Sequence, residues 1–164
     1  MRHAVRAFLS AFVVLLAAAA PGFAQATPIA HGNGVYEIQG EPLLLSFNVV
    51  ELPNGEVRGH VFTKNQVTGG ILHSKVTSYM FLDDVLLVAG PLTAAVNAPP
   101  QFVLGATKFY AFKDNGDGTP PDEVTGGVAP IEFGDLTIQQ IVAIGGGPPP
   151  STFMPLTAGD ITIN

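Results

Sequence analysis

The chain has no cysteine and no tryptophan, and only 12% of its 164 residues are charged. Without cysteine it cannot be held by disulfide bonds or by a thiolate metal centre, so a hydrophobic core or bound ions must stabilise it. Apolar residues make up 47% of the sequence, and this fraction is sufficient to build such a core. The composition therefore indicates a globular domain that depends on packing.

The N-terminal segment has the pattern of a secretory signal. Two arginines, an apolar run and a helix breaker follow one another in it: Arg2, Arg6, Phe8–Ala20 and Pro21-Gly22. The run is shorter than the roughly 20 residues that a membrane-spanning helix needs, and no second run follows it. Small residues at Ala24 and Ala26 predict cleavage after Ala26, with the bond after Ala24 as the alternative. We expect residues 1–26 to be removed and residues 27–164 to be secreted or periplasmic, with no membrane span.

The mature part would be one domain with an acidic surface. Removing 26 residues from 164 leaves 138, an ordinary size for a single domain. Two of the seven basic residues leave with the signal. Five basic and 13 acidic residues remain, so the net charge becomes −8. A surface of this charge repels nucleic acid and anionic lipid. We expect no nucleic acid as a partner.

Short runs of β-branched and aromatic residues, separated by Gly, Pro, Asn and Asp, predict an all-β domain. Sequential strands usually pair, so a single antiparallel meander of about eight strands is expected. The predicted strands are Gly34–Ile38, Leu43–Leu52, Val57–Lys64, Ile71–Leu82, Val85–Val96, Lys108–Lys113, Asp122–Val128 and Asp160–Asn164. A two-layer sandwich and a partly closed barrel both fit this order.

Side-chain alternation predicts which faces are buried. Leu43, Leu45, Phe47 and Val49 share one face of their strand, and this face is expected in the core. In the aromatic strand, Lys108, Tyr110 and Phe112 share one side, and Phe109, Ala111 and Lys113 share the other. The terminal Ile161 and Ile163 are expected to be buried in the sheet, since apolar side chains at a chain end add little stability unless they are buried.

Turn residues predict how the strands are joined. Asn54-Gly55, after Pro53, is typical of a type I′ hairpin turn, and Leu156–Gly159 is predicted to turn the chain into its last strand. Pro91 must lie at an edge, a bulge or a strand end, because it has no N–H for a ladder.

The segment Ile131–Ile144 is ambiguous. Asp135 is able to cap a short helix through Gln139 and Gln140, but β-branched residues dominate and favour a strand. We predict a strand, with the helix as the alternative. Gly145–Pro150 is predicted to be an irregular surface loop.

The layout resembles a family of exported bacterial all-β domains to which no activity is attached. The residues that carry the resemblance are a strand that reads Val57-Arg58-Gly59-His60-Val61, the turn Asp114-Asn115-Gly116, and the closing strand Leu156-Thr157-Ala158-Gly159-Asp160-Ile161-Thr162-Ile163. The resemblance implies the all-β fold and the export route. It implies no catalytic residues.

The acidic segment after the aromatic strand is the best chemical candidate. Its oxygen-bearing side chains are Asp114, Asn115, Asp117, Asp122 and Glu123, and calcium binds clustered carboxylate, amide and carbonyl oxygens. The EF-hand spacing fails, because the third and fifth positions from Asp114 are Gly116 and Gly118. We therefore predict a solvated turn without a metal ligand or cofactor. The alternative is a calcium site at Asp114, Asn115, Asp117 and Asp122.

Other reactive side chains form no recognisable catalytic set. His60 and His73 lie on neighbouring predicted strands, but His60 is expected to face solvent and no third metal ligand accompanies them. No serine lies in a G-x-S-x-G elbow. Five aromatic residues are a possible ligand platform, although core packing is the commoner role at strand spacing: Tyr79, Phe81, Phe109, Tyr110 and Phe112.

Three functions remain open. The first is a non-enzymatic exported domain that makes surface, adhesion or ligand contacts through its loops. The second is a small barrel that carries an apolar ligand or acts on it as an enzyme, which an internal cavity would favour. The third is a calcium-stabilised form of the first. The sequence places the non-enzymatic domain first and identifies no partner.

Overall fold

The computed structural model describes residues 25–117, 119–129, 131–145 and 152–164. Nine strands lie in these ranges: β1 (Thr27–Ile38), β2 (Glu41–Glu51), β3 (Val57–Asn65), β4 (Ile71–Val76), β5 (Ser78–Leu82), β6 (Val85–Val96), β7 (Thr107–Lys113), β8 (Glu123–Val128) and β9 (Met154–Ile163). A 3-10 turn, η1 (Ile131–Phe133), and a short helix, α1 (Ile138–Ala143), precede β9. Most of the expected signal segment lies outside the described residues, as do residues 146–150 of the predicted irregular loop. Both remain predictions.

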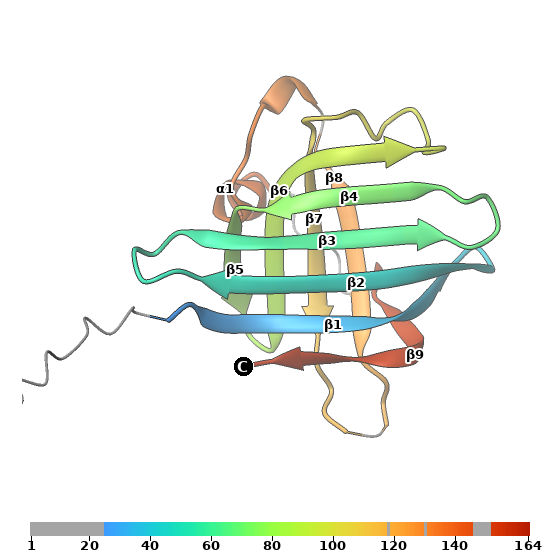
Figure 1. Cartoon of the computed structure of the whole chain (residues 1–164), viewed down its shortest axis with the longest axis horizontal. Helices are drawn as coiled ribbons and strands as arrows, with labels where there is room; N and C mark the ends of the chain where they lie inside the picture. The colour runs from blue at the N-terminus through green and yellow to red at the C-terminus, as the bar shows by residue number, and fades with distance from the viewer. Residues whose placement is uncertain (1–24, 118, 130, 146–151) are drawn as a thin grey trace, which may run out of the picture.

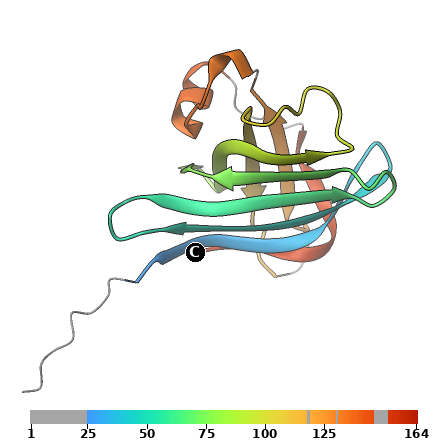
Figure 2. The ribbon, with the colours of Figure 1, turned by 45° about the horizontal axis from the view of Figure 1, so that its top comes forward.

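Eight of the strands close into a barrel. They pair in the order β4-β3-β2-β1-β9-β8-β7-β6, and β4 pairs in turn with β6, while β5 pairs with β6 beside this ring. All of these pairings are antiparallel. Strands β1 to β4 cross in front of β6 to β8 (Figure 1), and the tilted view shows the two walls facing each other across the interior (Figure 2). The all-β antiparallel prediction is confirmed, with a barrel rather than a sandwich.

Strand β6 forms one corner of the barrel. It pairs with β5 and β7 up to Ala89 and Pro91, and with β4 from Leu92 onward. At the change of partner a Cβ on Gly90 would lie only 1.9 Å from the Lys75 carbonyl oxygen, so a residue without a side chain is needed there. Pro91 follows immediately, where an N–H is not needed by the neighbouring ladder.

Two predicted segments differ in the structure. The expected strand Ile71–Leu82 is broken at Thr77, whose N–H donates to the Ala89 carbonyl at 2.9 Å. Its first half pairs with β3 and with the end of β6, whereas its second half pairs with the start of β6. The predicted turn Leu156–Gly159 is instead part of β9. The strand is irregular at this point: its register against β1 shifts between Val35 and Tyr36, and Gly159 has a φ of 99°.

The β2–β3 hairpin does not use the predicted type I′ turn. That turn needs positive φ at both central residues, but only Gly55 has it, at 79°. The Gly55 N–H donates to the Leu52 carbonyl, and the Leu52 N–H donates to the Glu56 carbonyl. This pattern is a type I turn followed by a bulge, which suits the fixed φ of Pro53.

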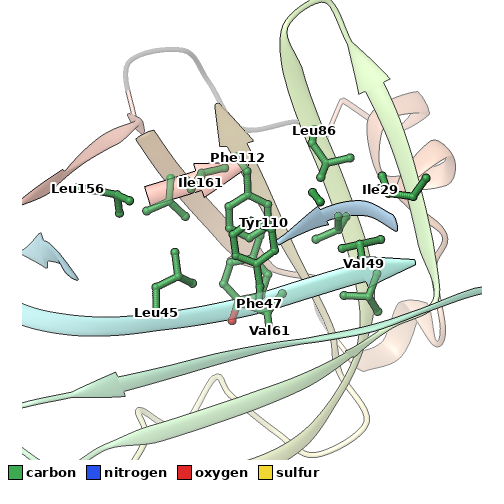
Figure 3. Close-up of a cluster of buried hydrophobic side chains, with 14 of the residues drawn as sticks. Ile29, Leu45, Phe47, Val49, Val61, Leu86, Tyr110, Phe112, Leu156 and Ile161 are labelled. Carbon is green, nitrogen blue, oxygen red and sulfur yellow. The ribbon is translucent and has the colours of Figure 1, made fainter. Parts of the chain in front are cut away.

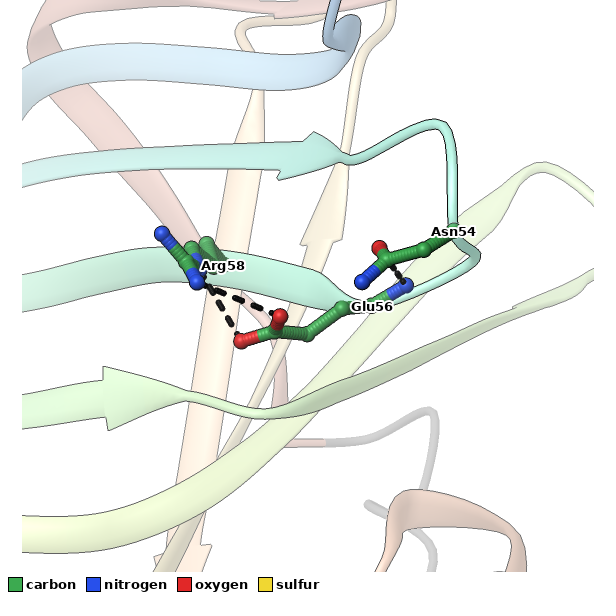
Figure 4. Close-up of polar contacts among 3 residues, drawn as sticks. All are labelled: Asn54, Glu56 and Arg58. Carbon is green, nitrogen blue, oxygen red and sulfur yellow. Dashed lines mark hydrogen bonds and ion pairs between the residues drawn. The ribbon is translucent and has the colours of Figure 1, made fainter.

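Side chains reinforce this turn from its outer side (Figure 4). Asn54 Oδ1 accepts a hydrogen bond from the Glu56 N–H at 3.0 Å. The Glu56 carboxylate accepts two bonds from the Arg58 guanidinium, at 2.9 and 3.2 Å. Arg58 lowers the pKa of Glu56 mainly through this hydrogen bond. The group is exposed, so its contribution to stability is small.

The strand predicted for Ile131–Ile144 is wrong. Helix α1 begins after Thr137, which forms a capping box with Gln140. Ile138 and Ile141 are buried and pack on the outer face of β6 and β7, where Leu87, Ala89 and Ala111 lie. The two buried isoleucines are three residues apart, which places them on one face of a helix. This burial and the capping box outweigh the preference of β-branched residues for a strand. The cap is Thr137 rather than the Asp135 considered from the sequence.

The main core fills part of the barrel interior (Figure 3). Phe47 from β2 stacks on Phe112 from β7, with ring centroids 3.9 Å apart and planes 4° from parallel. Buried aliphatic side chains surround this pair: Ile29, Leu45, Val49, Val61, Leu86, Leu156 and Ile161. The alternation predicted for β2 and β7 is confirmed, since Leu45, Phe47 and Val49 point inward and Ala111 lies in the outer cluster.

We predict that Phe112→Ala lowers the free energy of unfolding by about 3–5 kcal/mol, because it removes the stacked ring and leaves a cavity in the middle of the barrel. The matched control is Phe81→Ala on β5. Phe81 is 45% exposed and touches Tyr79 only edge to face, so its loss is expected below about 1 kcal/mol. Urea unfolding of both variants measures the difference, and equal losses would contradict the assignment of the core.

Candidate functional site

A pocket of about 620 Å³ opens at one end of the barrel. This end carries the β1–β2 turn, the β3–β4 turn and the loop between β6 and β7. The pocket is lined by Tyr36, Ile38, Gln39, Glu41, Leu43, Thr63, Asn65, Thr68, Gly70, Leu72, Asn97, Ala98, Pro99, Gln101, Phe102, Lys108 and Tyr110. Its volume lies within the roughly 300–1,000 Å³ typical of small-molecule sites.

Two tyrosines mark the inner part of the pocket, beside the filled half of the barrel. Tyr36 and Tyr110 belong both to the pocket lining and to the buried core that contains Phe47 and Phe112. Burial raises the pKa of Tyr110 to about 12, and raises that of Tyr36 even further, with a smaller contribution from Tyr110. Both phenols are therefore neutral over the physiological pH range.

Buried hydroxyls lie next to this part of the pocket. Ser74 and Thr63 lie close enough to Tyr110 to lower its pKa slightly against the effect of burial. Even so, neither the Tyr110 hydroxyl nor the Ser74 hydroxyl has a well-formed hydrogen bond to another described group. A buried hydroxyl without a partner costs free energy, so the interior retains polar groups that core packing alone does not explain.

Lys108 is the cation of the pocket. Its side chain points into the barrel with those of Tyr110 and Phe112, and the residue is only 7% exposed. The ammonium Nζ lies 4.7 Å from the centre of the Tyr110 ring and 5.2 Å from that of Phe102. The ion pairs found among the described residues do not include Lys108. Burial lowers its pKa to about 8, because the charged form is poorly solvated there.

The carboxylate in the pocket lining, that of Glu41, already accepts a hydrogen bond. Glu41 accepts a hydrogen bond from the Asn65 side-chain amide, and this bond joins β2 to the end of β3. Asn97 and Gln101, from the β6–β7 loop, supply further amide groups to the lining. The pocket thus combines an apolar and aromatic wall with one buried cation and several neutral polar groups.

The structure assigns structural contacts to three of the calcium candidates. Asp122 is buried, and its two carboxylate oxygens accept hydrogen bonds from the N–H groups of Asn115 and Ile161, at 2.8 and 2.7 Å. Asp114 accepts from the N–H groups of Gly116 and Ile163, at 2.8 and 3.1 Å. The Asn115 side-chain amide donates to the Pro121 carbonyl. These contacts tie the β7–β8 loop to β9.

Asp117 lies apart from this network, because it is exposed at the tip of the loop. Glu123 lies at the start of β8 and is partly buried. Within the described ranges, no three acidic or histidine side chains gather in a way that would hold a metal ion. The expected solvated turn therefore needs correction at Asp122, which is buried and hydrogen-bonded.

The two histidines do approach each other, on the outer face of the barrel. The rings of His60 and His73 stack with centroids 5.7 Å apart, and His73 Nδ1 lies 2.6 Å from the Thr93 hydroxyl. Neither histidine lines the pocket. The expectation that His60 points away from the core is consistent with its place on β3, since Val61 and Thr63 occupy the inward positions.

The five aromatic residues do not form one platform. Tyr110 and Phe112 point into the barrel, whereas Phe109 packs against the cluster around α1. Tyr79 and Phe81 contact each other on β5, and the Tyr79 hydroxyl donates to the Glu51 carboxylate. Lys108 is a site residue that was not predicted from the sequence. Its signal was present, because alternation places it on the same face as Tyr110 and Phe112.

Compared with known proteins, the chain significantly matches no family model, no curated protein and no solved structure. The resemblance to exported bacterial β-domains therefore remains a prediction. None of the helices in the described ranges has the length and apolar character that crossing a bilayer requires.

We predict that Asp122→Asn lowers the free energy of unfolding by about 1–3 kcal/mol, because the new amide presents N–H groups to a backbone donor in a buried position. Asp117→Asn removes the same charge from the exposed tip and is expected to change stability by less than about 0.5 kcal/mol. Thermal and urea unfolding measure both variants. A similar, small effect of the two substitutions would show that the contacts of Asp122 contribute little.

We predict that Lys108→Met stabilises the free protein below pH 8, by up to about 3 kcal/mol, because methionine keeps the apolar stem and removes a poorly solvated charge. The native pKa is about 8 and the ordinary value is 10.5, so the unfolded state binds more protons between these values. The wild-type protein therefore gains stability relative to the variant as pH rises through this window. Urea unfolding at pH 7, 9 and 10.5 follows the difference, and a constant difference would contradict it.

Proposed function

We propose that this barrel binds a small, mainly apolar molecule in the pocket at its open end, and that it acts as a carrier. The pocket itself is the observation that supports the proposal. Closed barrels of about eight strands have room for side chains or for one small ligand. Here the Phe47–Phe112 stack occupies one part of the interior, and the part toward Lys108 is open.

The composition of the lining supports binding rather than catalysis. Ile38, Leu43, Leu72 and Phe102 supply apolar contact area, and a few polar groups are available to orient a ligand. The described lining contains one carboxylate and no histidine, and both of its tyrosines have raised pKa values. Lys108 is the lining residue whose pKa lies near neutral, but no ion pair of the described residues joins it to an acid or a base, and Glu41 already accepts a hydrogen bond from Asn65.

Because of the pocket, we place this function ahead of the loop-contact domain and of its calcium-stabilised form. Among the described loop residues, no comparable feature supports a surface or adhesion role, and the carboxylates of Asp114 and Asp122 already accept backbone hydrogen bonds. We also propose that the carrier works outside the inner membrane, as a secreted or periplasmic protein. The support for that step is the signal pattern at the N-terminus.

We predict that the protein binds N-phenylnaphthylamine, a neutral apolar fluorophore, saturably and with one site per chain. Ala98 lines the pocket from the β6–β7 loop, so Ala98→Trp places a large side chain in it and is expected to weaken binding at least tenfold. Ala143→Trp is the matched control, since Ala143 is exposed at the end of α1. Fluorescence titration measures all three proteins.

The control protein should bind as the wild type does. If the wild type shows no saturable binding, or if both tryptophan variants bind equally well, the pocket is not the ligand site and the proposed function is wrong. Circular dichroism of each variant before titration confirms that the barrel is folded.

A further inference from the structure

Lys108 is a buried cation placed where a ligand would lie. It is nine-tenths buried and lines the pocket, and its ammonium faces two aromatic rings. Cation–π contacts of this kind offset only part of the cost of burying an unpaired charge. A methionine or leucine would fill the same position without that cost, so the fold by itself gives no reason for the charge.

We infer that the ligand is a monocarboxylate with an apolar body, and that its carboxylate pairs with Lys108 under the β6–β7 loop. This inference rests on the proposed function, because it names the class of ligand for the same pocket. The ammonium lies over the rings of Phe102 and Tyr110. The apolar body then lies against the aliphatic part of the lining, Leu43 and Leu72.

The charges of the lining favour a singly charged head group. Lys108 is the one basic residue among the described lining residues, and Glu41 lies in the same pocket. A doubly charged phosphate would keep one charge unpaired there and would be repelled by Glu41. Asn97 and Gln101 carry neutral amides that are able to donate to the second carboxylate oxygen.

Pairing with a carboxylate makes binding depend on the protonation of Lys108. A negative charge beside the ammonium raises its pKa from the value of about 8 in the free protein. Above pH 8 the protein therefore takes up a proton when it binds the carboxylate, and affinity falls as pH rises. The other titratable groups of the lining are Glu41 from β2, Tyr36 from β1 and Tyr110 from β7. Burial raises the pKa of both tyrosines, so they stay neutral in this range.

The test compares decanoate with decanol, which share one apolar body and differ in charge. Each displaces N-phenylnaphthylamine at pH 7 from the wild type and from Lys108→Met, Lys108→Arg and Glu41→Gln. We expect the wild type to bind decanoate about tenfold or more tightly than decanol. Lys108→Met should lose at least tenfold for decanoate with little change for decanol, Lys108→Arg should restore part of the loss, and Glu41→Gln should tighten decanoate a few-fold.

A second measurement distinguishes pairing from a structural role of the lysine. Calorimetry at pH 8.5 in two buffers of different ionisation enthalpy reports protons taken up on binding. Uptake is expected for decanoate with the wild type, and neither for decanol nor for Lys108→Met. If probe and decanol bind while decanoate gains nothing from Lys108, the carboxylate inference is wrong and the proposed function stands. If none of the three binds, the proposed function itself is wrong.

Discussion

The stacking of Phe47 on Phe112 is the contact on which the arrangement of this barrel depends. The two rings come from opposite walls, β2 and β7, and meet face to face at 3.9 Å. They belong to the main core, together with the aliphatic side chains buried in the barrel. The pocket occupies the interior on the other side of Tyr110. A single aromatic pair thus separates the part of the barrel that stabilises the fold from the part available to a ligand.

Closure of the barrel places the residues of the pocket together. Strand β6 changes partner at Gly90 and Pro91, and β9 pairs with β8 through Met154 and Pro155 before it joins β1. These two corner strands turn a linear meander into a ring, so that β1, β2, β3, β4 and β7 all contribute side chains to one cavity. The hydrogen bonds of Asp122 to the β7–β8 loop and to β9 hold the second corner.

Lys108 shows how stability and binding oppose each other in this pocket. Removing water from an ammonium disfavours the folded state, and its lowered pKa records this cost. The same removal of water strengthens any attraction between the ammonium and an anionic ligand. A buried charge that lacks a counter-ion in the free protein therefore has a physical explanation if the counter-ion arrives with the ligand.

Local patterns in the sequence were sufficient for most of the strands and for the side chains that share a face, because alternation acts over a few neighbouring positions. These patterns failed where contacts between distant parts of the chain decide the local structure. The predicted strand breaks at Thr77 because its first half pairs with β3 and the end of β6, whereas its second half pairs with the start of β6. Helix α1 forms because Ile138 and Ile141 pack on a surface of β6 and β7. The sequence alone determined that Lys108 shares a face of its strand with Tyr110 and Phe112. Only the tertiary structure decided that this face is a pocket, because a cavity depends on how the opposite walls fill the space between them.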